Sequence, residues 1–466
     1  MQRRLEPTMS RCDTPGRTEL RRALILTAAS LGFVVVQLDV TIVNVALQQI
    51  GRSLGADVSH LQWVVDAYTI VFASLIPTAG ALGDRLGAKR IFVAGFAVFI
   101  AASCGCAVAP TMPVLIAARA AQGVGAAALV PCSLSLLNHS FPDPNARAKA
   151  VAIWAAGASV ALAAGPVIGG ILVDGVSWRS IFVINLPICT TGIWLARCFG
   201  RELSRSRARG IDAGGQVAVV LALAALATAA IEAGRLGITH PIVIAACGLF
   251  IAAATAFVLI EARGSNPMLP LSLFHTPAFS AAMAVGLLIN IAYYGLIFLF
   301  SLFLQRAKGF SSLQTGLAFL PMTMGVLVAN LGAGTVAARL GPRLPMVLGQ
   351  AMMSLGCVAL LGLTPRTSIA MMALPMLLMG AGVGLVVPPM TSSVLGTVDR
   401  AQSGVASGAL NATRQAGSVL GVALYGALIA GPGALTSGTR AALGVSAGLL
   451  LVGCAAALRY IRAGDD

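Results

Sequence analysis

Long apolar runs follow one another along almost the whole chain and are separated by short polar connectors. A helix needs roughly 20 consecutive apolar residues to cross a hydrocarbon core of about 30 Å, and about fourteen runs reach that length. The pattern predicts membrane-spanning helices at 23–46, 62–82, 91–110, 112–134, 148–172, 180–198, 214–232, 241–261, 279–304, 315–337, 344–363, 369–393, 403–430 and 441–460.

The two halves of the chain repeat each other. The motif DRLGAKR at 84–90 recurs as ARLGPR at 338–343, and GVGAAALVP at 123–131 recurs as GAGVGLVVP at 380–388, at offsets of about 254 and 257 residues. These matches relate the first six runs to the last six and leave the seventh and eighth as an inserted pair. We therefore predict an all-α integral membrane protein of two six-helix bundles plus two linker helices.

Two six-helix halves that hold a substrate between them near the middle of the bilayer are typical of secondary transporters. The repeat divides the chain into a cytoplasmic N-terminal segment at 1–22, an N-terminal six-helix bundle at 23–198, cytoplasmic linkers with the inserted helices at 199–278, a C-terminal six-helix bundle at 279–461 and a cytoplasmic tail at 462–466.

Composition also places the chain in a membrane. Hydrophobic residues make up 58% and charged residues 10%, with a mean hydropathy of +0.89, outside the range of soluble domains. The net charge of +15 does not indicate nucleic-acid binding, because the basic residues lie in connectors rather than on one amphipathic face. Roughly 22 of them fall on the side of the N-terminus and about 7 on the other, which predicts cytoplasmic termini and a location in the cytoplasmic membrane.

Three charged side chains are predicted to lie well inside spans, namely Asp39, Arg119 and Arg414. A charge there costs at least about 2.5 to 3.5 kcal/mol on insertion scales. Asp39 and Arg119 both lie about 10 Å from the same membrane face, so a direct or water-mediated pair is geometrically allowed. Two interpretations stay open, a structural ion pair and a proton-coupling site in which a change of partner alters the pKa of the carboxyl group.

Asp66, in QWVVDAYTI, is a further candidate for proton coupling. It lies about one turn from the outer end of the second span. We expect solvent access or an interfacial position to keep its carboxylate ionised at little cost.

The connector GALGDRLGAKR at 80–90 is short enough to require a tight turn. Its glycines permit close helix approach, and Asp84 can face a helix N-terminus. A loop that only sets topology would explain the basic residues but not Asp84 or the glycine spacing. The candidate switching residues here are Gly80, Gly83, Asp84, Arg85, Gly87 and Arg90.

The fifth span carries GASVALAAGPVIGG at 157–170. Pro166 removes a backbone donor and is expected to kink the helix, and glycines spaced by four residues allow a neighbouring helix to pack closely. No strand precedes this segment, so it is not a dinucleotide-binding fingerprint. Its candidate switching residues are Gly165, Pro166, Gly169 and Gly170.

Together these segments resemble the major facilitator superfamily, and specifically its fourteen-span drug:proton antiporter branch, over essentially the whole chain. Residues 80–90 resemble the cytoplasmic loop signature, and the Arg119 segment resembles the fourth-span arginine motif. Residues 157–170 resemble the fifth-span motif associated with antiport, and LDVTIVNVAL at 38–47 resembles the first-span signature of exporters.

The resemblance implies roles for individual residues. Asp39 and Arg119 would take part in proton coupling, and Asp84 would stabilise one access state. The kink at Gly165 and Pro166 would govern leakage between the halves.

The segment at 406–421 resembles the thirteenth-span signature of the branch, which gives a structural or gating role to Asn411, Arg414 and Gln415. The chain departs from the family at Gln48, where proline is frequent. The second half has no intramembrane carboxylate between Glu261 and Asp399, so acid-dependent coupling is expected in the N-terminal half.

A substrate cavity is expected between the bundles, lined by apolar, aromatic and a few polar side chains. Each aromatic candidate has the alternative of facing lipid or packing between helices. The candidates are Gln122, Trp154, Asn290, Tyr293, Tyr294, Asn411, Arg414 and Gln415.

These observations predict a secondary active transporter that exports small amphipathic drugs or antibiotics in exchange for protons and confers resistance. The expected partners are the drug, protons and the lipid bilayer, with no nucleic acid, no metal and no cofactor beyond the proton motive force, and the expected unit is a monomer. A nucleotide-driven pump is disfavoured because GxxxxGK[ST] is absent. An enzyme is disfavoured because the histidines and cysteines are scattered. A proton-coupled symporter or an exporter of a specific metabolite stays open.

Overall fold

The computed structural model describes residues 15–200, 212–264, 271–398, 403–431 and 433–461, and none of these residues lies in a β-strand. The elements follow in the order α1 (Pro15–Leu54), α2 (Val58–Leu86), α3 (Ala88–Ala107), α4 (Met112–Ser140), α5 (Pro144–Gly175), α6 (Ser180–Val183), α7 (Asn185–Phe199), α8 (Ala213–Leu236), α9 (Pro241–Arg263), η1 (Leu271–His275), α10 (Pro277–Leu302), the π-helical η2 (Phe303–Ala307), α11 (Ser312–Ala318), α12 (Leu320–Leu340), α13 (Arg343–Ala359), α14 (Ile369–Gly396), α15 (Ser403–Leu428) and α16 (Leu435–Tyr460).

Twelve helical segments of the described residues are long and apolar enough to cross a membrane. The other two predicted spans, 344–363 and 403–430, coincide with α13 and α15. Of these, α13 is shorter, and α15 does not belong to this apolar set. The predicted all-helical membrane fold is confirmed, whereas the count of fourteen spans is not.

Two predicted spans are each divided into a short and a long helix. Ile184 separates α6 from α7, and Phe319 separates α11 from α12. A proline follows each break, at Pro187 and Pro321. Proline has no N–H for the preceding turn and its ring crowds that turn, which accounts for the interruption of both helices.

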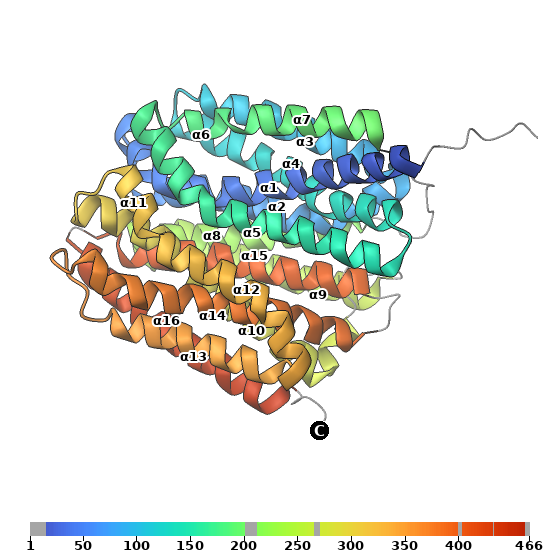
Figure 1. Cartoon of the computed structure of the whole chain (residues 1–466). Coiled ribbons are helices and arrows are strands. Elements are labelled where there is room, and N and C mark those ends of the chain that lie inside the picture. The colour runs from blue at the N-terminus through green and yellow to red at the C-terminus, as the bar shows by residue number, and fades with distance from the viewer. Residues whose placement is uncertain (1–14, 201–211, 265–270, 399–402, 432, 462–466) are drawn as a thin grey trace, which may run out of the picture.

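In Figure 1 the first half lies toward the top, with α3, α4, α6 and α7 uppermost, and the second half toward the bottom, with α10, α13, α14 and α16 lowermost. In the first half, α1 packs against α4, α5 and α7, and α4 packs against α2 and α3. In the second half, α10 packs against α14, α15 and α16, and α14 packs against α12 and α13. The same helix pairs are therefore in contact in each half, while the domain bounds themselves stay a prediction.

The repeat extends to individual glycines at helix crossings. A Cβ atom added at Gly125 of α4 would lie 2.8 Å from the carbonyl oxygen of Gly95 on α3. Gly382 of α14 faces the carbonyl of Gly349 on α13 in the same way. These pairs are separated by the offsets of the repeated motifs, 257 and 254 residues. Small residues let helix backbones approach each other within a membrane.

The inserted pair covers one side of the boundary between the halves. Helix α8 packs against α2 of the first half and α15 of the second, while α9 packs mainly against α8. Gln216 on α8 donates a hydrogen bond to the Ser74 carbonyl of α2 at 2.7 Å and accepts one from Thr78. The insertion is thus fixed to the bundle through α8.

Candidate functional site

A buried ion pair lies within the N-terminal half. Nη1 of Arg119, on α4, donates a hydrogen bond to Oδ2 of Asp39, on α1. Asp39 is 0% exposed and Arg119 is 1% exposed. Neither charge would be tolerated alone at this burial, so each side chain supplies the counter-charge of the other. The structure thus contains the ion pair that the predicted depths of Asp39 and Arg119 in the membrane allow.

Neutral side chains complete the hydrogen bonding of Asp39. Its Oδ1 accepts from Nδ2 of Asn185 at 3.2 Å and from Nε2 of Gln122 at 3.4 Å. Oγ of Ser103 accepts from the same two amides, at 3.3 and 2.8 Å. Oε1 of Gln122 accepts from Arg119 at 2.9 Å. One network therefore joins α1, α3, α4 and α7.

Two members of this network are absent from the sequence prediction, and one is placed differently. Ser103 carries no local signal, and the signal for Asn185 is its place in an apolar span two residues before Pro187. Gln122, predicted to line the substrate cavity, is 0% exposed in this conformation, and its amide bridges Arg119 and Asp39.

Aromatic rings and a backbone carbonyl enclose the guanidinium group of Arg119. Its Nε donates to the carbonyl oxygen of Val64 at 3.0 Å. Its Cζ lies 4.4 Å from the ring centroid of Tyr68 and 5.9 Å from that of Phe182. A desolvated cation–π contact contributes about 2 kcal/mol. Arg119 therefore keeps partners on α2 and α6 if the contact with Asp39 is broken.

Asp66 lies in a different environment from the one predicted. It is 0% exposed, and neither carboxylate oxygen has a hydrogen-bond partner among the described residues. The expectation of solvent access is wrong, because α8 and α15 cover α2 along this part of the helix, where Ile70 packs against Ala227 and Val419. Asp66 is thus a buried carboxyl group for which the described residues supply no counter-charge.

The connector at 80–90 forms the tight turn that its length requires. Helix α2 ends at Leu86, α3 begins at Ala88, and Gly87 between them has a φ of 104°. Its repeat equivalent Gly341 has a φ of 73°. Only glycine adopts this region without strain.

Asp84 of this connector is exposed and forms no hydrogen bond or ion pair with a described residue. Its predicted contact with a helix N-terminus is therefore not formed in the described part of the chain. The N-terminus of α3 has no side-chain cap. Gly83, one residue earlier, faces Cys132 of α4, where an added Cβ would lie 2.9 Å from Sγ.

The glycines of the fifth span face two different helices. A Cβ at Gly165 would lie 3.0 Å from Cβ of Thr41, and one at Gly169 would lie 3.0 Å from the carbonyl oxygen of Ile42, both on α1. Gly170 instead meets the backbone of α11. Helix α5 is continuous through Pro166. One face of α5 therefore packs against α1 of its own half, and the adjacent face packs against α11 of the other half.

The halves are tied together at the outer face, which here denotes the side where α1 ends. Asp174 near the end of α5 accepts hydrogen bonds from the backbone N–H groups of Ser312, at 3.1 Å, and Leu313, at 2.8 Å, at the start of α11. At the crossing related to it by the repeat, Nε2 of Gln62 on α2 donates to the carbonyl oxygens of Val422 and Ala423 on α15, at 3.0 and 2.8 Å.

Two predicted cavity residues are buried between helices. Asn290 is 5% exposed, and its Nδ2 donates to the Gly286 carbonyl of its own helix at 2.7 Å. Tyr293 is 3% exposed and packs edge-on against Tyr294, with 5.3 Å between ring centroids. In this conformation Asn290 and Tyr293 are therefore packed between helices, and their place in a substrate cavity stays a prediction. Gly417 explains the burial of Asn290, because its lack of a side chain lets α15 approach α10.

The remaining predicted cavity residues are half-buried: Trp154, Tyr294, Asn411, Arg414 and Gln415. Trp154 stacks on Phe33 at 4.1 Å between ring centroids and donates to Ser133 Oγ at 3.1 Å. Nε of Arg414 is buried and has no hydrogen-bond partner among the described residues. Tyr294 lies within electrostatic reach of Arg414 and of Tyr68, the ring that covers Arg119.

Comparison with known proteins assigns this architecture to a family. The sequence model of the Major Facilitator Superfamily matches residues 29–422. The chain belongs to this superfamily. Among solved structures, the D-xylose-proton symporter superposes with a TM-score of 0.69 at 12% identity, covering 94% of this chain and 98% of the symporter, which shows the shared fold.

Relatives of known name share more of the sequence. A protein of Bacillus subtilis called methylenomycin A resistance protein is 39% identical over 414 residues, which are 87% of each chain. The multidrug resistance protein Stp of Mycobacterium tuberculosis is 37% identical, over 89% of this chain and 76% of its own length. The protein is thus a multi-pass member of a membrane-transporter family.

Proposed function

We propose that this protein is a secondary active transporter that exports small amphipathic drugs or antibiotics across the cytoplasmic membrane in exchange for protons, and so confers resistance. The buried Asp39–Arg119 pair is the observation that carries the proposal. Isolated ion pairs in a membrane interior are expensive and mark sites where charge moves. The names of the relatives, which refer to drug and antibiotic resistance, support the substrate class.

The network around the pair suggests how binding of a proton changes the structure. A proton on Asp39 removes the counter-charge of Arg119 while the amide of Gln122, the Val64 carbonyl and the Tyr68 ring still hold the guanidinium. Tyr68 lies within electrostatic reach of Tyr294 of the other half. A drug that binds beside Tyr294 therefore acts on the ring that covers Arg119, which couples the drug site to the proton site.

Asp66 supplies a second proton-binding group in this proposal. Both of its carboxyl oxygens are buried without a hydrogen-bond partner among the described residues, and burial of an unpaired charge is expensive. Asp39, in contrast, is matched to a cation. In this proposal both carboxyl groups bind protons, Asp39 as the counter-charge of Arg119 and Asp66 without a paired cation among the described residues.

The switching residues are proposed to act at the two faces of the membrane. The exposed Asp84 is free to contact the other half when the inner face closes, which would stabilise the alternative access state. The glycines at 165, 169 and 170 keep α5 in contact with α1 and α11 while the halves rock against each other. The transporter is proposed to act as a monomer with both termini in the cytoplasm.

Efflux from cells that express the protein tests the proposal. One proton that enters through the membrane potential yields about 2.3 kcal/mol per 100 mV. We expect cells loaded with a fluorescent amphipathic cation to lose it faster than cells without the protein, and a protonophore to abolish the difference. Inverted vesicles that accumulate no drug on energisation, but release a metabolite along with protons, would instead favour a symporter.

The two hydrogen bonds that Asp174 accepts from the start of α11 form a latch at the outer face. This latch allows a further prediction. Asp174→Ala removes two hydrogen bonds to α11, each contributing about 0.5 to 1.5 kcal/mol, so we expect a roughly tenfold shift toward an open outer face. Spin labels at Val176 and Leu361, in a background without the native cysteines, measure the distance between the halves.

Asp143→Ala is the matched control for the latch, because Asp143 caps its own helix by accepting from the Ala146 N–H at 2.7 Å. That variant should leave the distance distribution between Val176 and Leu361 unchanged. An Asp174→Ala distribution identical to that of the control would show that the latch does not hold the halves together.

A further inference from the structure

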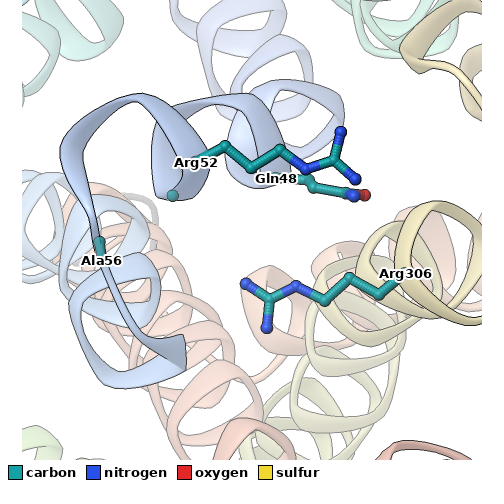
Figure 2. A pocket seen from close by; sticks show the side chains of 5 residues that line it. Gln48, Arg52, Ala56 and Arg306 are labelled. Atoms are coloured by element: carbon teal, nitrogen blue, oxygen red, sulfur yellow. The ribbon is translucent and has the colours of Figure 1, made fainter.

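A small pocket opens at the outer face, where the last turn of α1 approaches the end of α10. It has a volume of about 300 Å³ and is lined by Gln48, Gly51, Arg52, Ala56 and Arg306. Figure 2 shows the Arg52 side chain beside Gln48 on one side of the opening and Arg306 extending into it from the other. Two cationic groups from different halves therefore share one pocket.

The internal repeat accounts for the meeting of these two arginines. Arg52 and Arg306 are 254 residues apart, the offset of the repeated loop motif. Gly55 and Gly309, which follow them at the same offset, both have positive φ, 63° and 73°. The same turn thus carries one arginine in each half. Packing of the two similar halves brings both arginines to a common position at the outer face.

The described residues satisfy neither guanidinium group. In the described part of the chain, Arg52 and Arg306 form no hydrogen bond and no ion pair. Two like charges that face one pocket repel each other. An anion placed between them would relieve the repulsion and accept hydrogen bonds from both.

The acidic residue within electrostatic reach of Arg306 is already engaged. Oδ1 of Asp57 accepts from the backbone N–H of His60 at 2.9 Å and lies 2.7 Å from the His60 ring Nδ1. Burial works to raise the pKa of Asp57, but the hydrogen bonds from His60 outweigh it and hold the pKa below its ordinary value. Asp57 therefore caps the start of α2 and contacts the His60 ring, and it forms no ion pair with Arg52 or Arg306.

Gln48 adds a neutral polar group to the same pocket. It is 6% exposed, and its buried Oε1 has no hydrogen-bond partner among the described residues. A buried acceptor without a partner costs free energy, and a water or a protonated oxyanion in the pocket could donate to it. An amide N–H beside two guanidinium groups is a donor set suited to an oxyanion.

We propose that Arg52, Arg306 and Gln48 form a binding site for a small oxyanion, a carboxylate, sulfate or phosphate group, at the outer face. A water molecule occupies roughly 30 Å³, so a pocket of about 300 Å³ holds such a group with several waters. The site joins the two halves, so its occupation stabilises the conformation in which the outer face is closed. The proposal does not depend on which drug is exported.

Sulfate titration of the purified full-length protein tests the site. In nanodiscs of phosphatidylcholine, with chloride holding the ionic strength constant, we expect saturable sulfate binding by calorimetry. Arg52→Gln and Arg306→Gln should each raise the Kd about tenfold, through loss of a charge-assisted interaction. Gln48→Met, which keeps the volume and removes the amide, should raise it severalfold.

Arg366→Gln is the matched control, because Arg366 is exposed in the connector between α13 and α14 and does not line the pocket. It removes one positive charge and should leave the sulfate Kd unchanged. Equal sulfate affinity in Arg52→Gln, Arg306→Gln and Arg366→Gln would overturn the proposal. So would the absence of saturable binding in the unmodified protein.

A second lipid composition identifies the source of the oxyanion. If a lipid headgroup occupies the site, nanodiscs that contain phosphatidylglycerol should weaken sulfate binding by competition in the unmodified protein but not in Arg306→Gln. If dissolved anions occupy it, the sulfate Kd should be the same in both compositions. Either result supports an oxyanion site and assigns its ligand.

Discussion

Asp39→Asn is expected to reduce proton-driven efflux about a hundredfold while the protein remains inserted in the membrane. Asparagine keeps the shape of the side chain and can still accept from Asn185, but it removes the charge that balances Arg119. Breaking one side of a buried ion pair costs about 3 to 5 kcal/mol. The contacts of Arg119 with Val64 and Tyr68 retain part of this energy, so folding survives and coupling is lost.

Asp212→Asn is the matched control for this substitution, because the Asp212 carboxylate caps α8 by accepting from the Gly215 N–H at 2.8 Å. Asparagine is an equally good N-cap, so efflux should match that of the unmodified protein. Drug binding to purified Asp39→Asn separates lost coupling from lost binding. Full protonophore-sensitive efflux in Asp39→Asn would remove Asp39 from the proposed mechanism.

The helices and the repeat could be predicted from the sequence because both depend on local information. The length of a span can be counted directly from an apolar run. The glycine-rich turn at Gly87 recurs at Gly341, which also has a positive φ. Depth along a helix is also local, since the rise per residue is constant. This is why the sequence allowed the pairing of Asp39 with Arg119, whose contact the structure contains.

The rotation of a helix about its axis depends on the helices that pack against it, which local sequence does not reveal. The wrong expectations about side-chain environment follow from this. The sequence placed Asp66 near solvent, but α8 and α15 cover that face of α2. It placed Gln122 in a cavity, but the partners that bury its amide, among them Ser103, lie on other helices. The contribution of Asn185 depends on where α6 and α7 divide, which apolar periodicity does not mark.

Gly380→Ala is expected to destabilise the fold strongly. Gly380 of α14 lies directly against the carbonyl of Met322 on α12, so an added Cβ would overlap the backbone and force the helices apart. Overpacking costs typically 1 to 3 kcal/mol, and a backbone obstacle places this site at about 3 kcal/mol. The measurement is the melting temperature and the monodisperse yield of the purified protein in detergent.

Gly332→Ala should have the opposite sign and serves as the control. A Cβ at Gly332, on the neighbouring α12, would meet no atom within 4 Å, and alanine favours a helix over glycine by about 1 kcal/mol. The repeat supplies an independent check, because Gly123 lies against the Tyr68 carbonyl, where an added Cβ would be 2.6 Å from the oxygen. Gly123→Ala should therefore resemble Gly380→Ala. Equal yields for the variants at Gly380 and Gly332 would mean that the crossing of α12 and α14 relaxes freely, and that the glycines repeated in both halves are not needed for close packing.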